Sequence, residues 1–435
     1  MKILIKNGRV INPATQFDAV CDVAIASGRI IGIEHIGAEF KPGRVIDARG
    51  CIVLPGLVDL AVRLREPGYE HEGMLESEMA AAVAGGVTSV VCPPDTDPVL
   101  DEPGLVEMLK FRAEKLHQSR VFPLGALTRG LKGAVLTEMV ELTEAGCVGF
   151  SQAEVALEDT LVLQRALQYA STFGYTVWLR PQDFHLGKGV AASGPLATRM
   201  GLSGVPVAAE TIALYTIFEL MKATGARVHL CRLSSAAGVE LVRQAKREGL
   251  KLSCDISINS LQLTDADIGY FDSRARLNPP LRQQRDRDAL RAGLADGTVD
   301  ALVSDHTPVD EDAKTLPFAE AEAGATGLEL LLSQALKWSG QDSVPLVRAL
   351  AVITSAPAGV IGATLGTLQA SVGQLVEGGV ADVCIFDPAT HWTVGPDTLR
   401  SQGKYTPFSG HELPGRVRCT LVGGQVAFDA GLPAS

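Results

Sequence analysis

The chain has 435 residues, of which 46% are apolar, with 45 glycines and 23 prolines. This length and the many turn-forming residues indicate a globular protein with one large domain and a smaller one. The net charge of −11 and the lack of a basic run argue against a nucleic acid or an anionic membrane surface as a partner.

The N-terminal segment, MKILIKNGRVINP, is interrupted by Lys2, Lys6 and Arg9, so we expect a strand there and not a signal peptide. No apolar segment is expected to approach membrane-spanning length. The cysteines are scattered without a C-x-x-C pair, mostly in apolar runs, which indicates buried thiols in a reducing compartment. They are Cys21, Cys51, Cys92, Cys147, Cys231, Cys254, Cys384 and Cys419. We therefore expect a cytoplasmic protein.

Both ends of the chain alternate apolar and polar residues around glycine-rich turns, a pattern typical of half-buried antiparallel strands. We assign residues 1–53 and 365–435 to one small β-sandwich-like domain. A domain built from both termini keeps the chain ends close together, as is common in folded proteins.

Between these ends, residues 54–364 alternate short apolar strands with amphipathic helices. Roughly eight such alternations over about 300 residues favour an α/β fold of the (β/α)8 barrel type. The predicted strands are 52–62, 87–92, 121–127, 147–150, 175–179, 227–231, 250–256 and 300–305. The predicted helices are 76–84, 103–116, 133–145, 157–172, 207–224, 235–248 and 284–295. The absence of a G-x-G-x-x-G loop argues against a dinucleotide-binding fold.

Chemistry in such a barrel is expected where the strands end. The ends carry arginines and acidic residues, but the sequence contains no H-x-H, no H-E-x-x-H and no Cys/His cluster with zinc spacing. His229, within the sixth strand, is interpreted as a core histidine.

Six segments together resemble dihydroorotase, a metal-dependent amidohydrolase, over nearly the whole chain. They are PGLVDLAVRLREPG, GGVTSVVCPPDTDPVLD, LNPPLR, SDHTP, ITSAPAGVIG and KYTPFSGHELPGRV. The resemblance implies a TIM barrel of the amidohydrolase type with a small β domain.

The resemblance also implies that the metal site of the family is lost. The H-x-H pair, the acidic or carbamylated-lysine ligand after strand four and the two later histidines correspond to Ala61, Arg63, Gln152 (or Ala153), Arg180 and Arg232. Only one ligand, Asp305, is retained. Because arginine offers donors and no lone pair, we expect no zinc, no other cofactor and no catalytic residue. Instead we expect the arginines to pair with Asp305 and Asp183, and the pKa of Asp305 to be lowered by them.

A vestigial substrate pocket is the second implication. Arg65 matches the family arginine that holds the substrate carboxylate, and Asn278 matches an asparagine that contacts substrate. Asp95 stands where the family has another asparagine, and His306 follows the retained aspartate. This pocket either still grips a carboxylated ligand or is a leftover loop held by its own hydrogen bonds, and we favour the second interpretation.

The chain resembles the inactive dihydroorotase-like subunit that some bacteria combine with aspartate carbamoyltransferase in pyrimidine biosynthesis. The resemblance implies a non-catalytic assembly subunit of a hetero-oligomer, with equal numbers of the two chains in a dodecamer. Two alternatives stay open: an active amidohydrolase with an altered metal site, and a sensor that binds a pyrimidine intermediate without turnover.

Overall fold

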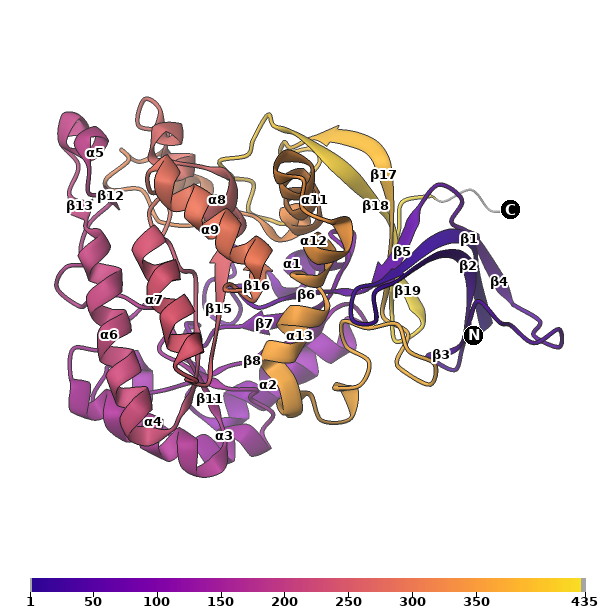
Figure 1. Ribbon diagram of the computed structural model, residues 1–435, viewed down its shortest axis with the longest axis horizontal. Coiled ribbons are helices and arrows are strands. Elements are labelled where there is room, and N and C mark those ends of the chain that lie inside the picture. The colour runs from indigo at the N-terminus through magenta and orange to yellow at the C-terminus, as the bar shows by residue number, and fades with distance from the viewer. Residues whose placement is uncertain (1, 432–435) are drawn as a thin grey trace.

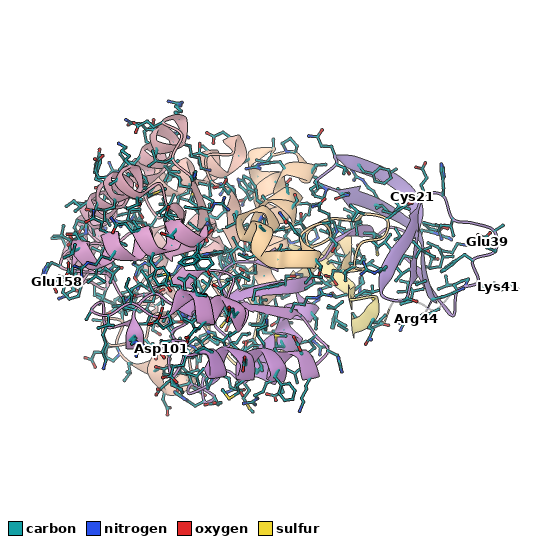
Figure 2. The ribbon with its side chains drawn as sticks, turned by 90° about the horizontal axis from the view of Figure 1, so that it is seen from below. Cys21, Glu39, Lys41, Arg44, Asp101 and Glu158 are labelled. Atoms are coloured by element: carbon teal, nitrogen blue, oxygen red, sulfur yellow. The ribbon has the colours of Figure 1, made fainter. Side chains whose placement is uncertain are left out.

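The computed structural model describes residues 2–431, which form a barrel and a curved sheet beside it (Figure 1). The first and last strands, β1 and β19, belong to this sheet, and helices surround the barrel strands. Figure 2 shows Glu39 and Lys41 of the sheet domain at one end of the molecule and Glu158, from a barrel loop, at the opposite end. The predicted barrel and the predicted sheet from both termini are confirmed.

The terminal strands pair in one continuous sheet, in the order β19-β18-β17-β5-β1-β2-β3, with β4 paired to β1. Ile5, Val23, Val383 and Leu421, from both halves of the sheet, share one buried cluster. The sheet therefore curves over its own core. The strands are β1 (Lys2–Asn12), β2 (Phe17–Ala26), β3 (Arg29–Ile33), β4 (Arg44–Asp47), β5 (Ile52–Pro55), β17 (Val383–Thr393), β18 (Glu412–Val422) and β19 (Gln425–Asp429).

The chain passes from the terminal sheet to the barrel at Gly56. Strand β5 pairs with β1 and β17, whereas β6 (Leu57–Asp59) pairs with β7 (Val87–Cys92) in the barrel. A Cβ atom on Gly56 would lie 2.1 Å from Thr88 Oγ1, so this approach requires glycine. The sheet continues to Pro55, two residues past the boundary predicted at residue 53.

The barrel strands run parallel in two groups, β6-β7-β8 and β9-β10-β11-β14-β15-β16. Leu124 joins the groups on one side by donating its N–H to the Cys92 carbonyl, and Val62 pairs with His306 on the other. These contacts close the barrel. The strands not yet given are β8 (Arg120–Pro123), β9 (Gly125–Ala126), β10 (Phe150–Ser151), β11 (Thr176–Leu179), β14 (Arg227–Leu230), β15 (Leu252–Ser257) and β16 (Ala301–Val303), and a loop adds β12 (Ala191–Ala192) and β13 (Gly204–Val205).

Helices follow most barrel strands and cover their outer side (Figure 1). They are α1 (Leu75–Ala84), α2 (Pro103–Lys115), α3 (Met139–Glu144), α4 (Thr160–Phe173), α5 (Pro195–Met200), α6 (Val207–Thr224), α7 (Ala236–Arg247), α8 (Ile258–Gln262), α9 (Gln284–Asp296), α10 (Glu311–Thr315) and α11 (Leu331–Asp342). Short 3-10 turns add η1 (Arg129–Leu131), η2 (Asp265–Ile268), η3 (Ser273–Ala275) and η4 (Leu328–Leu330).

Three short helical segments lie between α11 and β17: α12 (Leu346–Ala351), α13 (Ser355–Ile361) and the 3-10 segment η5 (Gly362–Leu368). Together they are long and apolar enough to cross a membrane by length and composition, which corrects our expectation that no segment is. In the structure, Ile361 and Leu365 share a buried cluster with Val58 and Val303 of the barrel strands.

Candidate functional site

Three arginines converge at the mouth of the barrel, where the strands end. Arg63 lies beyond β6, Arg180 follows β11 and Arg232 lies just beyond β14. Their side chains are only 8%, 7% and 6% exposed. All three form ion pairs with the carboxylate of Glu154, which lies three residues after β10.

Glu154 is the centre of this cluster. Its Oε1 accepts hydrogen bonds from Arg63 Nη2 at 2.8 Å and from Arg232 Nη2, and its Oε2 accepts from Arg180 Nη1 at 2.9 Å. Asn278 Nδ2 donates to the same Oε2 at 2.8 Å, and Asn278 Oδ1 accepts from Arg180 Nη2 at 2.7 Å. One carboxylate therefore holds three strand ends together.

Two further carboxylates complete the cluster. Asp95 Oδ2 accepts from Arg63 Nε at 2.9 Å, and Asp305 Oδ1 accepts from Arg232 Nη1 at 3.0 Å. With Glu154 they give three carboxylates for three guanidinium groups, so the formal charges balance. We call Arg63, Asp95, Glu154, Arg180, Arg232 and Asp305 the Arg–Glu154 network.

The structure differs from the pairing that we predicted. The Arg232–Asp305 pair is present, but Asp183 is not a partner of the arginines, because its Oδ1 accepts from the N–H groups of His185 and Leu186 in its own loop. The sequence analysis missed Glu154. Its signal was an acidic residue at the end of SQAE, directly after the positions matched to the family ligand.

Two of the positions that the resemblance matches to metal ligands lie outside the network. Ala61 has no polar side chain, and its carbonyl accepts the N–H of His306 at 3.1 Å. Gln152 Oε1 accepts from Thr128 Oγ1 at 3.0 Å, and its Nε2 donates to the Leu131 carbonyl at 2.8 Å. Gln152 therefore ties the loop after β9 to β10.

Burial and charge act in opposite directions on the two central acids. Burial raises the pKa of Asp305 and outweighs the opposing effect of Arg232 and Arg63, so our expectation of a lowered pKa was wrong. Burial also disfavours the charged form of Glu154, but Arg232, Arg180 and Arg63 together overcome it and hold the pKa of Glu154 well below its usual range.

The residues at the barrel mouth do not fit a divalent metal. The guanidinium groups of Arg63, Arg180 and Arg232 offer only donors, and both oxygens of Glu154 already accept from them. A dication within about 4 Å of each guanidinium would also be repelled by several kcal/mol per pair at an effective dielectric constant near 20. We therefore derive no metal-dependent step at this site.

Arg65, the candidate for holding a substrate carboxylate, already has protein partners. Its Nε donates to the Pro308 carbonyl at 2.9 Å and lies 2.6 Å from Glu72 Oε2, and its Nη2 lies 3.4 Å from Glu322 Oε1. A ligand carboxylate would have to compete with both acids. The cavity between Arg65, Asp95 and Asn278 has a volume of about 150 Å³, below the usual range for small-molecule sites.

His306, the fourth residue of the expected vestigial pocket, is not among the residues that line this cavity. It is fully buried, and its Nε2 lies 2.7 Å from Glu78 Oε2 of α1. Its Nδ1 accepts the N–H of Gly327 at 3.2 Å, which leaves the proton on Nε2 to donate to Glu78. His306 therefore links the eighth strand to α1.

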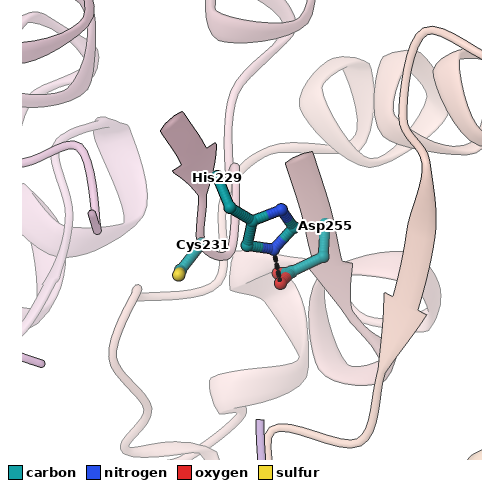
Figure 3. A group of neighbouring side chains, drawn as sticks. All are labelled: His229, Cys231 and Asp255. Carbon is teal, nitrogen blue, oxygen red and sulfur yellow. Dashed lines mark hydrogen bonds and ion pairs between the residues drawn. The ribbon is translucent and has the colours of Figure 1, made fainter. Parts of the chain in front are cut away.

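His229, Cys231 and Asp255 are the one group of three potential metal-binding side chains found in residues 2–431, with their candidate ligand atoms within 4.8 Å of one another (Figure 3). His229 is fully buried, with Nε2 2.8 Å from Asp255 Oδ2 and Nδ1 2.8 Å from Ser253 Oγ. Asp255 Oδ1 accepts the N–H of Arg232 at 2.7 Å, and burial raises the pKa of the Cys231 thiol. The ligand atoms are thus already hydrogen-bonded or protonated, and the group is a structural one.

Comparison with known proteins extends this description. A family model described as Dihydro-orotase-like matches residues 50–237. The chain is 42% identical over 430 residues to a dihydroorotase-like protein of Pseudomonas aeruginosa, which covers 99% of this chain and 100% of that one. It is 39% identical over 432 residues to a protein of Geobacter sp. strain M21 named dihydroorotase, with 99% and 100% covered.

Among solved structures, the chain is similar to the L-hydantoinase (dihydropyrimidinase) of Arthrobacter aurescens. The TM-score is 0.87 at 24% sequence identity, covering 98% of this chain and 96% of that one. A D-hydantoinase structure gives a TM-score of 0.84 at 21% identity, covering 100% and 97%. At these identities the likeness supports the fold, a barrel of the amidohydrolase type with an attached β domain.

Proposed function

Since this chain belongs to the dihydroorotase-like family of amidohydrolases, we propose that it is a non-catalytic member that acts as a structural subunit for aspartate carbamoyltransferase in pyrimidine biosynthesis. The proposal has two parts, the loss of catalysis and the assembly role, and they rest on different observations.

The Arg–Glu154 network supports the loss of catalysis. A metal-dependent hydrolase needs ligands that donate lone pairs, so that a bound water is activated near neutral pH. Here Arg63, Arg180 and Arg232 present donors, and Glu154 accepts from all three. The network lies at the ends of the barrel strands, where the active sites of such barrels are found, and so supports a non-catalytic role.

The assembly role rests on the resemblance to inactive subunits of bacterial aspartate carbamoyltransferase, and exposed apolar side chains are compatible with it. Leu161 of α4 and Ile212 and Tyr215 of α6 are 49%, 45% and 59% exposed. The two helices pack side by side, so these residues offer apolar surface to a partner chain.

The free thiols of all eight cysteines suit a reducing compartment, and we place the protein in the cytoplasm.

Metal content and turnover test the first part. Protein purified without chelators and then incubated with zinc or manganese is expected to contain no stoichiometric metal and to leave dihydroorotate unchanged, with an active dihydroorotase assayed in parallel as the positive control. One bound metal per chain together with ring opening of dihydroorotate would instead establish an active amidohydrolase with an altered metal site.

Co-assembly tests the second part. We expect the chain and the catalytic chain of aspartate carbamoyltransferase, mixed in equal amounts, to form one complex of equal stoichiometry, measured by size exclusion with light scattering. Ile212→Asp is expected to weaken the complex, whereas Arg247→Gln, an exposed change on α7, is the matched control. A transcarbamoylase that neither binds the chain nor changes in activity with it would contradict the proposal.

The sensor alternative is tested separately by ligand-induced stabilisation. A ligand that binds only the folded state raises the unfolding temperature. Because Arg65 is held by Glu72 and Pro308 and the cavity is small, we expect no shift with orotate or dihydroorotate. A saturable shift that Arg65→Gln abolishes would favour the sensor.

A further inference from the structure

A second polar cleft lies where the barrel meets the terminal sheet, between α11 and β18. It has a volume of about 240 Å³, and its lining includes Glu329, Ser333, Trp392, Arg400, Arg416 and Phe428. Helix α11 lies beside β17 and β18 in Figure 1. None of these residues belongs to the Arg–Glu154 network, so the cleft is a separate site.

Two arginines in this cleft are held by aromatic rings instead of acids. The guanidinium carbon of Arg416 lies 4.3 Å from the ring centre of Trp392, and that of Arg400 lies 5.0 Å from the ring centre of Phe428. Stacking fixes the plane of a guanidinium and leaves its N–H edges available. In the part of the chain that the structure describes, the aromatic rings are the recorded side-chain partners of both guanidinium groups, which form no ion pair or hydrogen bond there.

Glu329, the acid among the lining residues, compensates these charges only in part. Glu329 is buried, and its Oε2 accepts the backbone N–H groups of Arg400 at 2.8 Å and Ser401 at 3.2 Å. Burial raises the pKa of Glu329 to about 7, so near pH 7 a large share of this carboxyl is neutral. Burial lowers the pKa of Arg416; Glu329 opposes this effect, and the positive charges of Arg400 and Arg418 add to it. The cleft therefore carries an excess of positive charge.

We propose that this Arg400–Arg416 cleft binds a phosphate group, either as free phosphate or as part of a phosphomonoester. Each guanidinium group has parallel N–H donors that match the oxygens of a phosphate, and charge-assisted bonds of this kind are stronger than neutral ones. The stacked rings hold the donors in place before a ligand arrives, which lowers the entropy cost of binding.

Calorimetric titration of the full-length protein with inorganic phosphate tests the site, at constant ionic strength and with chloride as the reference anion. We expect saturable binding of one phosphate per chain. Arg400→Gln and Arg416→Gln are each expected to weaken it about tenfold, the loss typical of one charge-assisted hydrogen bond. Arg247→Gln, an exposed arginine on α7, is the matched control and should bind as the parent does.

A variant that is expected to bind phosphate more tightly serves as a second test, because misfolding would weaken binding and not strengthen it. Glu329→Gln removes the compensating carboxylate and should tighten phosphate binding severalfold. Titration with ribose 5-phosphate separates the two sources, since tighter binding than phosphate indicates a phosphomonoester and equal or weaker binding indicates the free ion. No saturable binding of either probe would overturn the proposal, as would folded Arg400→Gln and Arg416→Gln variants that bind phosphate like the Arg247→Gln control.

Discussion

Glu154 is the residue on which the barrel mouth depends most. Its carboxylate is the shared partner of Arg63, Arg180 and Arg232, and their side chains are almost fully buried. Removing one member of a buried ion cluster leaves uncompensated charge, which costs more than the pair contributes when intact.

Glu154→Gln is therefore expected to lower the free energy of unfolding by about 3 kcal/mol, measured by urea denaturation near pH 7. The control is Glu158→Gln in the same loop, where the side chain is 63% exposed and forms an ion pair with His185, so the change should stay below about 1 kcal/mol. Equal losses in the two variants would show that Glu154 does not stabilise the fold more than an exposed acid does.

Asp59 gives a prediction about pH. It is fully buried, and burial raises its pKa from 3.8 to about 7. The folded protein keeps this proton where the unfolded chain has lost it, so its stabilising contribution is complete below pH 3.8 and disappears as the pH rises through 7. Between about pH 4.5 and 6.5 the slope is about 1.4 kcal/mol per pH unit.

Asp59→Asn keeps an acceptor for the N–H groups of Ala61 and Ser304 but cannot titrate. Urea denaturation at several pH values measures the free energy of unfolding. We expect its decrease between pH 4.5 and 6.5 to become shallower in this variant by up to about 1.4 kcal/mol per pH unit. Asp397→Asn, on an exposed loop, should leave the slope unchanged. An unchanged slope in Asp59→Asn would contradict the assignment.

The sequence predicted which arginines stand at the strand ends, but not how they are neutralised. Residue type and position along the chain were enough for Arg63, Arg180 and Arg232. The sequence analysis named Asp183 as a partner and missed Glu154, because the direction of each loop after its strand is not encoded locally. The direction of the pKa shift of Asp305 was wrong for a related reason. Burial of its carboxyl group decides this shift, and the burial depends on the packing of the whole barrel.

At the scale of elements, periodic helices were predicted well and irregular ones poorly. The expected helix over 207–224 matches α6, because apolar periodicity marks its buried face over many turns. The expected helix over 133–145 shrinks to α3, because Thr128 pairs with Leu136 in a bridge just before the helix. The loop at 182–206 contains α5 and the short strands β12 and β13, which are too brief to leave a periodic signal.

The segment formed by α12, α13 and η5 is expected to behave as part of the core. Ile361 is 4% exposed and packs in the cluster that contains Val58 and Val303. Ile361→Ala should destabilise the fold by about 2–4 kcal/mol, because it removes buried carbons and leaves a cavity. Thr367→Ala, an exposed change in the same segment, is the control for urea denaturation and should cost less than about 0.5 kcal/mol. Similar costs for both would mean that the segment is peripheral.

For the whole molecule, the Arg–Glu154 network joins the ends of several barrel strands in one electrically balanced cluster. Replacing a single arginine by a metal-ligating residue is therefore not expected to create a metal site. Arg232→His removes a partner from both Glu154 and Asp305, and we expect a loss of about 3 kcal/mol in unfolding free energy and no stoichiometric zinc by elemental analysis. A stable variant that binds one zinc per chain would show that one substitution is enough to create a metal site here.

The balance of three cations and three anions at the strand ends also limits which substitutions can accumulate during evolution. Replacing one of these side chains alone leaves an unpaired charge inside a folded domain, so several of them would have to change together. Related sequences should therefore change guanidinium and carboxylate positions jointly.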